Sequence, residues 1–213
     1  MKRFFSAFVI IYLFTATLVF AQLEKETVII IHTDKGDITA KLYNETPKHR
    51  DNFIKLIKNG WFDGSEFHRV INNFMIQGGE SAKGAMDPGY RIDAEIHADL
   101  FHKKGALAAA REGDAVNPNR QSSGSQFYIV QGQKFNDQYL NMFEQKANIK
   151  FTQKQREVYK TIGGTPHLDG AYTVFGEVIS GLNVVDSIAA VKTNKEMGNR
   201  PVEPLTMKIE ILE

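Results

Sequence analysis

A β-hairpin pattern near the start of the globular sequence constrains the fold more than any other local feature. Residues 27–33 form a β-branched run, and residues 37–43 alternate apolar with polar side chains. Asp34-Lys35-Gly36 lies between the two runs and supplies a glycine for the turn. Alternation with a period of two places one face of each strand against a core. The fold is therefore expected to begin as an antiparallel sheet with one buried face.

Further strand-like runs follow, at 106–110, 125–130, 173–179 and 206–212. One helix is expected to begin at Thr46-Pro47, where Thr46 can cap and proline fits the first helical position, and to end at Gly60. A second is expected over residues 182–191. Many short strands with few helices are typical of an antiparallel barrel or sandwich. The 15 phenylalanines, against one tryptophan, predict a Phe-rich core.

The stretch from about Gln133 to Gly164 differs in kind from the strand-rich sequence around it. Thr152, with Gln155 three residues later, matches a capping box, and an apolar stripe follows before Gly163-Gly164. We therefore expect a helical insertion of one or two helices. Two roles stay open for it, because it either shapes a substrate lip or decorates the surface without function.

The N-terminal segment has the pattern of a secretory signal peptide. Lys2 and Arg3 precede an almost wholly apolar run that ends at Ala21, a small residue suited to cleavage. We expect residues 1–21 to be removed and residues 22–213 to form one domain. The alternative is an uncleaved anchor, because roughly 17 apolar residues is near the lower limit for spanning a bilayer.

Composition and motif content exclude several classes of function. A net charge of +1 without a basic block argues against nucleic-acid binding, and the absence of cysteine excludes disulfides and thiol chemistry. There is no Gly-x-Ser-x-Gly motif and no phosphate loop. His97 and His102, with Glu95 and Asp99, do not have metal-ligand spacing and are interpreted as a solvated acidic loop. We expect neither a metal nor another cofactor.

Three sequence blocks occur in order along the chain. They are Phe67-His68-Arg69-Val70 with Phe74-Met75-Ile76-Gln77-Gly78-Gly79, then Gly124-Ser125-Gln126-Phe127-Tyr128-Ile129, and finally His167-Leu168-Asp169-Gly170 with Val174-Phe175-Gly176. Together they strongly resemble the motifs of the cyclophilin family, and the resemblance spans roughly residues 27–212. It implies a closed eight-stranded antiparallel β-barrel with two flanking helices, to which the helical insertion is added. It also implies a peptidyl-prolyl cis/trans isomerase whose site lies on the barrel surface.

The resemblance also assigns roles to individual residues. The catalytic positions are Arg69, which would stabilise the twisted amide nitrogen, Gln77, which would orient it, and Phe74 in a hydrophobic proline pocket. The substrate-binding positions are Met75, Ala110, Arg111, Gln126, Tyr128, His167, Leu168 and Tyr172.

Four of these positions depart from the family pattern. His167 stands where many members have tryptophan, a residue that also contacts the inhibitor cyclosporin, so weak cyclosporin binding is expected. Tyr128 replaces phenylalanine and adds a hydroxyl that predicts a more polar pocket edge. Tyr172 replaces a frequent histidine, and Arg111 replaces an asparagine that acts mainly through its backbone.

The expected function is isomerisation of X–Pro bonds in unfolded or exported polypeptides. The leader places the protein in the periplasm or cell envelope of a Gram-negative bacterium, without membrane attachment after cleavage, and we expect a monomer although no residue pattern fixes the oligomeric state. One alternative is a proline-peptide binding or holdase module with little turnover. Another is a ligand-enclosing barrel of the lipocalin kind, which the abundance of large apolar residues disfavours.

Overall fold

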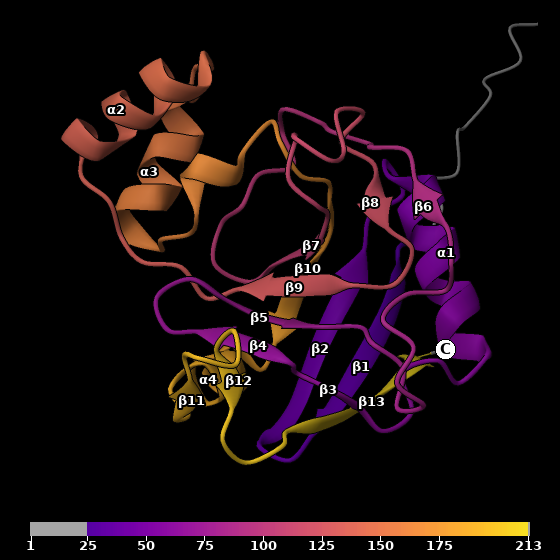
Figure 1. Ribbon diagram of the computed structural model, residues 1–213. Helices are drawn as coiled ribbons and strands as arrows, with labels where there is room; N and C mark the ends of the chain where they lie inside the picture. Colours follow the sequence, from indigo (N-terminus) through magenta and orange to yellow (C-terminus); the bar gives the residue numbers. More distant parts are fainter. Residues whose placement is uncertain (1–24, 213) are drawn as a thin grey trace, which may run out of the picture.

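The computed structural model describes residues 25–212, which form a curled antiparallel sheet with a helix on each side and a helical projection (Figure 1). The strands of the main sheet are β1 (Thr27–Thr33), β2 (Gly36–Leu42), β3 (Ser65–Glu66), β4 (Arg69–Ile71), β5 (Met75–Gly78), β7 (Ala106–Ala109), β9 (Phe127–Val130), β10 (Val174–Ser180) and β13 (Thr206–Leu212). The remaining strands form two small pairs, β6 (Arg91–Ile92) with β8 (Ser122–Ser123), and β11 (Thr193–Asn194) with β12 (Arg200–Pro201).

The predicted hairpin is confirmed as β1 and β2. The two strands pair in the register Ile31↔Ile38, and the apolar residues of both strands point to the same side. Ile29, Ile31 and Ile38 are 0% exposed, because the period-two pattern turns them all into the core. This hairpin continues into β13 on one side and β10 on the other.

The closed eight-stranded barrel implied by the family resemblance is wrong for this chain. Nine strands form an open half-barrel in the order β3-β13-β1-β2-β10-β7-β9-β5-β4. The edge strands β3 and β4 are separated only by Phe67 and His68, yet they are not paired with each other. The amide of Phe67 donates instead to the Leu205 carbonyl (3.0 Å) and that of Val70 to the Asn199 carbonyl (3.0 Å). The Phe67 bond continues the β3–β13 ladder, and the Val70 bond joins β4 to the segment before β12, so both amides are satisfied without closing the sheet.

Two helices cover the sheet as predicted. Helix α1 (Pro47–Lys58) has its proline at the first helical position, and α4 (Leu182–Ala189) packs Val185 and Ile188 into the core. The expected side-chain cap by Thr46 is not formed, because its hydroxyl donates to the Tyr43 carbonyl instead. The core includes the predicted phenylalanine cluster.

The region predicted as a helical insertion holds two helices, α2 (Asp137–Ala147) and α3 (Gln153–Thr161). The capping box of Thr152 and Gln155 is present at the start of α3. A β-bridge between Gln133 and Gly164 closes the base of the excursion. The two helices project from the sheet as a separate small unit, next to the short 3₁₀ helix η1 (Pro166–Leu168) (Figure 1).

The predicted signal peptide, residues 1–21, lies outside the described residues. Across residues 25–212, no helix combines the length and the apolar character that crossing a bilayer requires.

Buried His49 predicts a loss of stability at mildly acidic pH. Its ring is in hydrogen-bond contact with Glu95 (2.7 Å) and Ser122 (2.9 Å), and burial lowers its pKa below 6.5 although Glu95 opposes the shift. Desolvation also lowers the pKa of His68 and His167. The unfolded chain therefore binds more protons below pH 6.5 than the native state does, and stability falls as the pH drops through this window.

We expect the midpoint of urea unfolding to be lower at pH 5.5 than at pH 7.5. The variant His49→Gln should show a smaller difference between the two conditions, because one titrating group has been removed. A midpoint that is the same at both pH values would contradict this expectation.

Candidate active site

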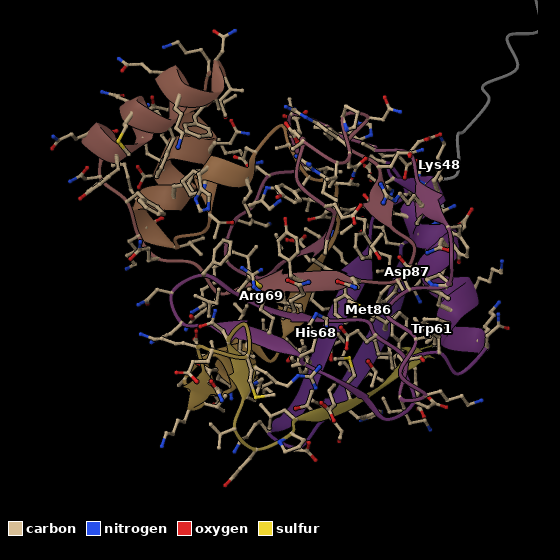
Figure 2. The ribbon with its side chains drawn as sticks, viewed as in Figure 1. Lys48, Trp61, His68, Arg69, Met86 and Asp87 are labelled. Atoms are coloured by element: carbon tan, nitrogen blue, oxygen red, sulfur yellow. The ribbon has the colours of Figure 1, made fainter. Side chains whose placement is uncertain are left out.

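A cavity of about 530 Å³ opens on the outer side of β5 and β9. All the site residues predicted from the sequence line it except His167. Figure 2 shows Arg69 near the middle of the molecule, with Met86 and Asp87 on the side toward α1. The predicted residues lie in or next to β4, β5 and β9, directly after β7, in η1, and in the loop that follows η1. The curled sheet thus brings together segments that are distant in sequence.

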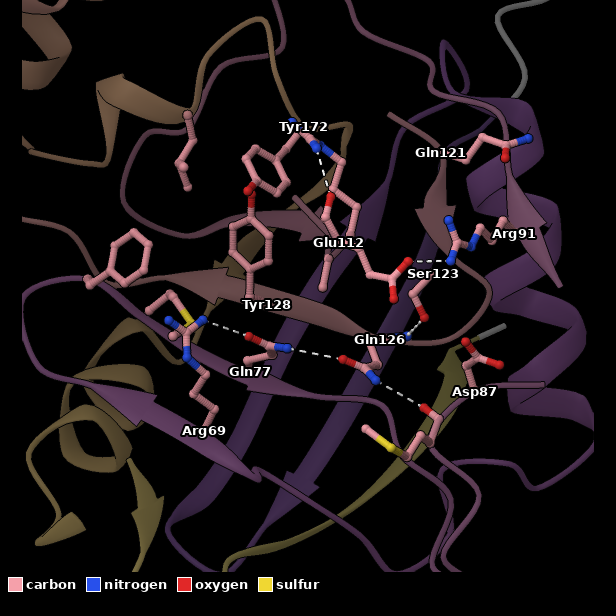
Figure 3. A pocket seen from close by; sticks show the side chains of 16 residues that line it. Arg69, Gln77, Asp87, Arg91, Glu112, Gln121, Ser123, Gln126, Tyr128 and Tyr172 are labelled. Carbon is pink, nitrogen blue, oxygen red and sulfur yellow. Dashed lines mark hydrogen bonds and ion pairs between the residues drawn. The ribbon is translucent and has the colours of Figure 1, made fainter. Parts of the chain in front are cut away.

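A row of polar side chains crosses the floor of this cavity (Figure 3). Arg69 and Gln77 are directly opposite each other in the β4–β5 pair, and the Arg69 guanidinium donates from Nη1 to Gln77 Oε1 at 3.0 Å. The other end of the Gln77 amide donates to Gln126 Oε1 at 3.2 Å. Gln126 in turn donates to the carbonyl of Met86 at 3.1 Å. The uncharged Gln77 amide thus fixes the orientation of the Arg69 guanidinium.

Among the described residues, Arg69 is in no ion pair with a carboxylate. Two other arginines at the same cavity are paired, Arg91 with Glu112 and Arg111 with Asp114. A guanidinium stays charged at all ordinary pH values. The cavity therefore contains a positive group held in place by an amide and not neutralised by an acid.

The cavity wall next to Arg69 is apolar. Met75 and Tyr128 are 1% and 4% exposed, and Phe74 and Leu168 pack against them while remaining half-buried. These four side chains make a hydrophobic recess beside the guanidinium, matching the predicted proline pocket in composition.

Gly79 allows the two strands to meet closely at this point. Its φ is +108°, and a Cβ there would lie 2.3 Å from the Ser125 carbonyl oxygen. Only glycine fits such an approach. The Gly78-Gly79 pair thus lets β5 run beside residues 125–126, which brings Gln77 within reach of Gln126.

The hydroxyl of Tyr128 does not give the pocket the polar edge that its sequence predicts. It lies 2.9 Å from Nε2 of His102, a side chain that is 0% exposed. Burial raises the pKa of Tyr128 well above 10 and keeps the hydroxyl protonated. The interpretation of His102 as part of a solvated acidic loop is likewise wrong, because its ring is enclosed between Tyr128 and Asp169.

Arg111 and Tyr172 brace the loop that follows η1. The Arg111 guanidinium lies over the Tyr172 ring at 4.5 Å and donates from Nε to the Ala171 carbonyl at 2.8 Å. Its Nη1 also contacts Asp114 at 2.7 Å. The Arg111 side chain thus makes defined contacts that its interpretation as a backbone-acting position did not anticipate.

His167 lies beside the cavity. Its ring stacks on Phe74 with a centroid distance of 5.6 Å, and Phe143 of α2 contacts its ring at 5.8 Å. Desolvation between these rings lowers its pKa and favours a neutral imidazole at pH 7. The position next to Phe74 agrees with the predicted neighbourhood, although His167 does not line the cavity.

The far half of the cavity was not predicted from the sequence. It is lined by Met86, Asp87, Arg91, Glu112, Gln121 and Ser123. The pairing of β6 with β8 places Arg91 opposite Ser123, and both strands are only two residues long. The only available signal was the turn at Asp87-Pro88-Gly89, because two-residue strands have no readable period.

Comparison with known proteins agrees with this geometry. Residues 28–211 match the family described as cyclophilin type peptidyl-prolyl cis-trans isomerase/CLD. A relative from Staphylococcus epidermidis, named as a peptidyl-prolyl cis-trans isomerase, is 39% identical over 184 residues, which is 84% of this chain and 88% of the relative. A Staphylococcus aureus protein of the same description is 39% identical over 187 residues, 83% and 90% of the two chains.

Solved structures show the same fold. A crystal structure of a cyclophilin type peptidyl-prolyl cis-trans isomerase from Cryptosporidium parvum has a TM-score of 0.64 at 24% identity, covering 89% of this chain and 99% of that one. A second structure of that protein, determined in the presence of the dipeptide Ala-Pro, gives a TM-score of 0.63.

Proposed function

Because this chain belongs to the cyclophilin-type peptidyl-prolyl cis-trans isomerases, we propose that Arg69 catalyses rotation about X–Pro bonds bound in the cavity. The observation that carries the proposal is the state of Arg69. Its charge is held by the Gln77 amide, is not paired with any described carboxylate, and adjoins an apolar recess.

The reaction asks for stabilisation of one strained state. Rotation about a peptide bond must overcome an amide-resonance barrier of roughly 18–20 kcal/mol. In the twisted amide the prolyl nitrogen regains a lone pair that the planar amide lacks. A fixed N–H fork aimed at this nitrogen binds the twisted state more tightly than the planar one, which lowers the barrier. No bond to carbon is broken, and Gln77 serves to keep the fork aimed.

The apolar recess supplies the binding energy for the proline ring. Phe74, Met75, Tyr128 and Leu168 form it, and Gln126 with Ala110 would hold the backbone before the proline. Fixing the ring while the preceding carbonyl rotates confines the motion to the one bond that must turn. The role of Phe74 is thus to hold the ring against the guanidinium.

We propose proline-containing segments of unfolded or exported polypeptides as the substrates. The open cavity supports this, because an extended chain can cross it without entering a closed chamber. The solved relative determined with Ala-Pro supports a proline peptide as the ligand. The signal-like residues 1–21 support export to a periplasm or cell envelope.

The direct test measures cis/trans exchange in a proline tetrapeptide by NMR exchange spectroscopy, with enzyme far below the peptide concentration. An isomerase accelerates exchange catalytically. A binding or holdase module would shift peptide resonances at stoichiometric concentrations without accelerating exchange, and that result would overturn the proposal.

The replacement of the family tryptophan by His167 predicts weak inhibition by cyclosporin. The variant His167→Trp adds aromatic area beside Phe74, and an aromatic contact is worth up to about 1.5 kcal/mol beyond area burial, or roughly tenfold in affinity. We expect the inhibition constant to fall by about that factor, with kcat/KM nearly unchanged. The measurement is a cyclosporin titration of isomerase activity, and equal sensitivity of the two proteins would contradict it.

A further inference from the structure

A continuous chain of buried polar groups links the helical insertion to the proline recess. The hydroxyl of Tyr159, on α3, lies 2.5 Å from Asp169 Oδ2. Asp169 Oδ1 lies 2.7 Å from Nδ1 of His102, whose Nε2 lies 2.9 Å from the Tyr128 hydroxyl. Tyr159 and His102 are 0% exposed and Tyr128 is 4% exposed. The catalytic role proposed for Arg69 makes no use of this chain.

The direction of the hydrogen bonds follows from the carboxylate. An ionised carboxylate only accepts, so the Tyr159 hydroxyl and the His102 Nδ1–H both donate to Asp169. The backbone amide of His102 donates to the same Oδ1 at 2.9 Å. In the tautomer with its proton on Nδ1, Nε2 is the acceptor for the Tyr128 hydroxyl. Burial raises the pKa of both tyrosines, so each hydroxyl is available as a donor. Every member of the chain is therefore satisfied in one arrangement.

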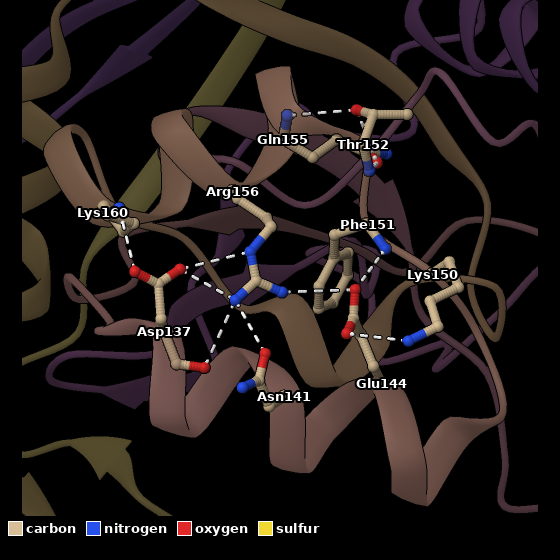
Figure 4. Close-up of polar contacts among 9 residues, drawn as sticks. All are labelled: Asp137, Asn141, Glu144, Lys150, Phe151, Thr152, Gln155, Arg156 and Lys160. Carbon is tan, nitrogen blue, oxygen red and sulfur yellow. Dashed lines mark hydrogen bonds and ion pairs between the residues drawn. The ribbon is translucent and has the colours of Figure 1, made fainter.

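Polar contacts hold the two helices of the insertion together. Arg156 of α3 clamps α2 by contacting Asp137 (2.8 Å), Asn141 (2.8 Å) and Glu144 (3.3 Å) (Figure 4). Glu144 also accepts from the Phe151 amide at 2.8 Å, which fixes the turn between the helices. A few buried apolar side chains alone would hold such a small unit less firmly.

The base of the insertion fits closely against His102. A Cβ at Gly164, whose φ is +157°, would lie 2.2 Å from the His102 carbonyl oxygen and 2.7 Å from the Tyr159 ring. The Thr165 amide donates to the same carbonyl at 2.8 Å. Glycine at this position thus allows α3 to reach the buried histidine.

We propose that the insertion positions the proline recess, with Tyr159, Asp169 and His102 acting as positioning residues that fix the ring of Tyr128 against the bound substrate. The inference deepens the proposed function and rests on it. It gives the Tyr128 hydroxyl, which departs from the family pattern, and the insertion a shared role. That role differs from both the substrate lip and the surface decoration considered for residues 133–164.

The test compares Tyr159→Phe with Tyr128→Phe and with the double variant. Each single change removes one hydroxyl and leaves its buried partner without that hydrogen bond. We expect kcat/KM to fall by about threefold to tenfold, mainly through kcat. If the hydroxyls act through one chain, the double variant loses little more than either single variant does. All assays are made at a temperature where circular dichroism shows each protein fully folded. The matched control is Tyr139→Phe, which removes an exposed hydroxyl from α2 of the same insertion and should leave kcat/KM unchanged.

An independent readout is the ¹⁵N resonance of His102 Nε2. It should shift in Tyr159→Phe, although Tyr159 does not contact that nitrogen, and should not shift in Tyr139→Phe. Unchanged kcat/KM in Tyr159→Phe, or additive losses in the double variant, would overturn the inference. If the wild-type protein failed to accelerate exchange, the proposed function would fail instead, and the His102 resonance would still report whether the chain is coupled.

Discussion

Replacing Arg69 by alanine is expected to lower kcat/KM by about 10²–10³-fold, the usual loss when one preorganised electrostatic donor is removed. The physical reason is that the guanidinium meets a lone pair that exists only in the twisted amide, so its loss raises the barrier and leaves ground-state binding almost intact. Peptide affinity, measured by titration of the proline tetrapeptide, should change by no more than about twofold because the apolar recess remains.

Two companion variants make this result specific. Arg69→Lys keeps the charge but loses the planar fork that Gln77 aligns, so it should recover only part of the activity. Arg200→Ala removes a partly exposed arginine that pairs with Glu66 outside the cavity, and it should behave as the wild type. Full activity in Arg69→Ala would contradict the mechanism. Equal losses of activity and peptide affinity would indicate that Arg69 contributes to substrate binding and not to the rotation step.

Short sequence patterns were sufficient to predict the elements whose structure is determined by neighbouring residues. The β1–β2 hairpin, α1 and the capping box of α3 each follow from a period, a proline or a cap within a short window. The residues that the motif blocks single out around Arg69 and Gln77 line one cavity, because neighbouring strands carry them in register.

What the sequence could not show depends on contacts between distant segments. The sheet is open, and residues 199 and 205, far along the chain, accept the backbone N–H groups of Val70 and Phe67 near its two edges. His102 was interpreted as a polar loop residue, because no local sequence pattern indicates that Asp169 and Tyr128 are its partners. The far half of the cavity depends on two-residue strands and was missed for the same reason.

The second large effect is expected at Phe53, the centre of the aromatic core. Its ring lies 4.9 Å from Phe62, 5.2 Å from Phe127 and 5.3 Å from Phe175, so one side chain joins α1 to β9 and β10. Removing it leaves a cavity, and β9 and β10 cannot move to fill it because each is hydrogen-bonded to a strand on either side. Phe53→Ala should therefore cost about 3–5 kcal/mol of unfolding free energy, a large part of the roughly 5–15 kcal/mol typical of a whole domain.

Urea unfolding followed by circular dichroism measures this loss as a lower midpoint with the slope retained. Tyr139→Ala is the matched control, since it truncates an aromatic residue that is 53% exposed on α2 and should change stability by less than about 0.5 kcal/mol. β9 also carries Tyr128 in the recess. The kcat/KM of the Phe53 variant should therefore be lost together with its folded structure as urea is added. If Phe53→Ala lowered the unfolding free energy no more than Tyr139→Ala does, the aromatic cluster would not be what holds α1 to the sheet.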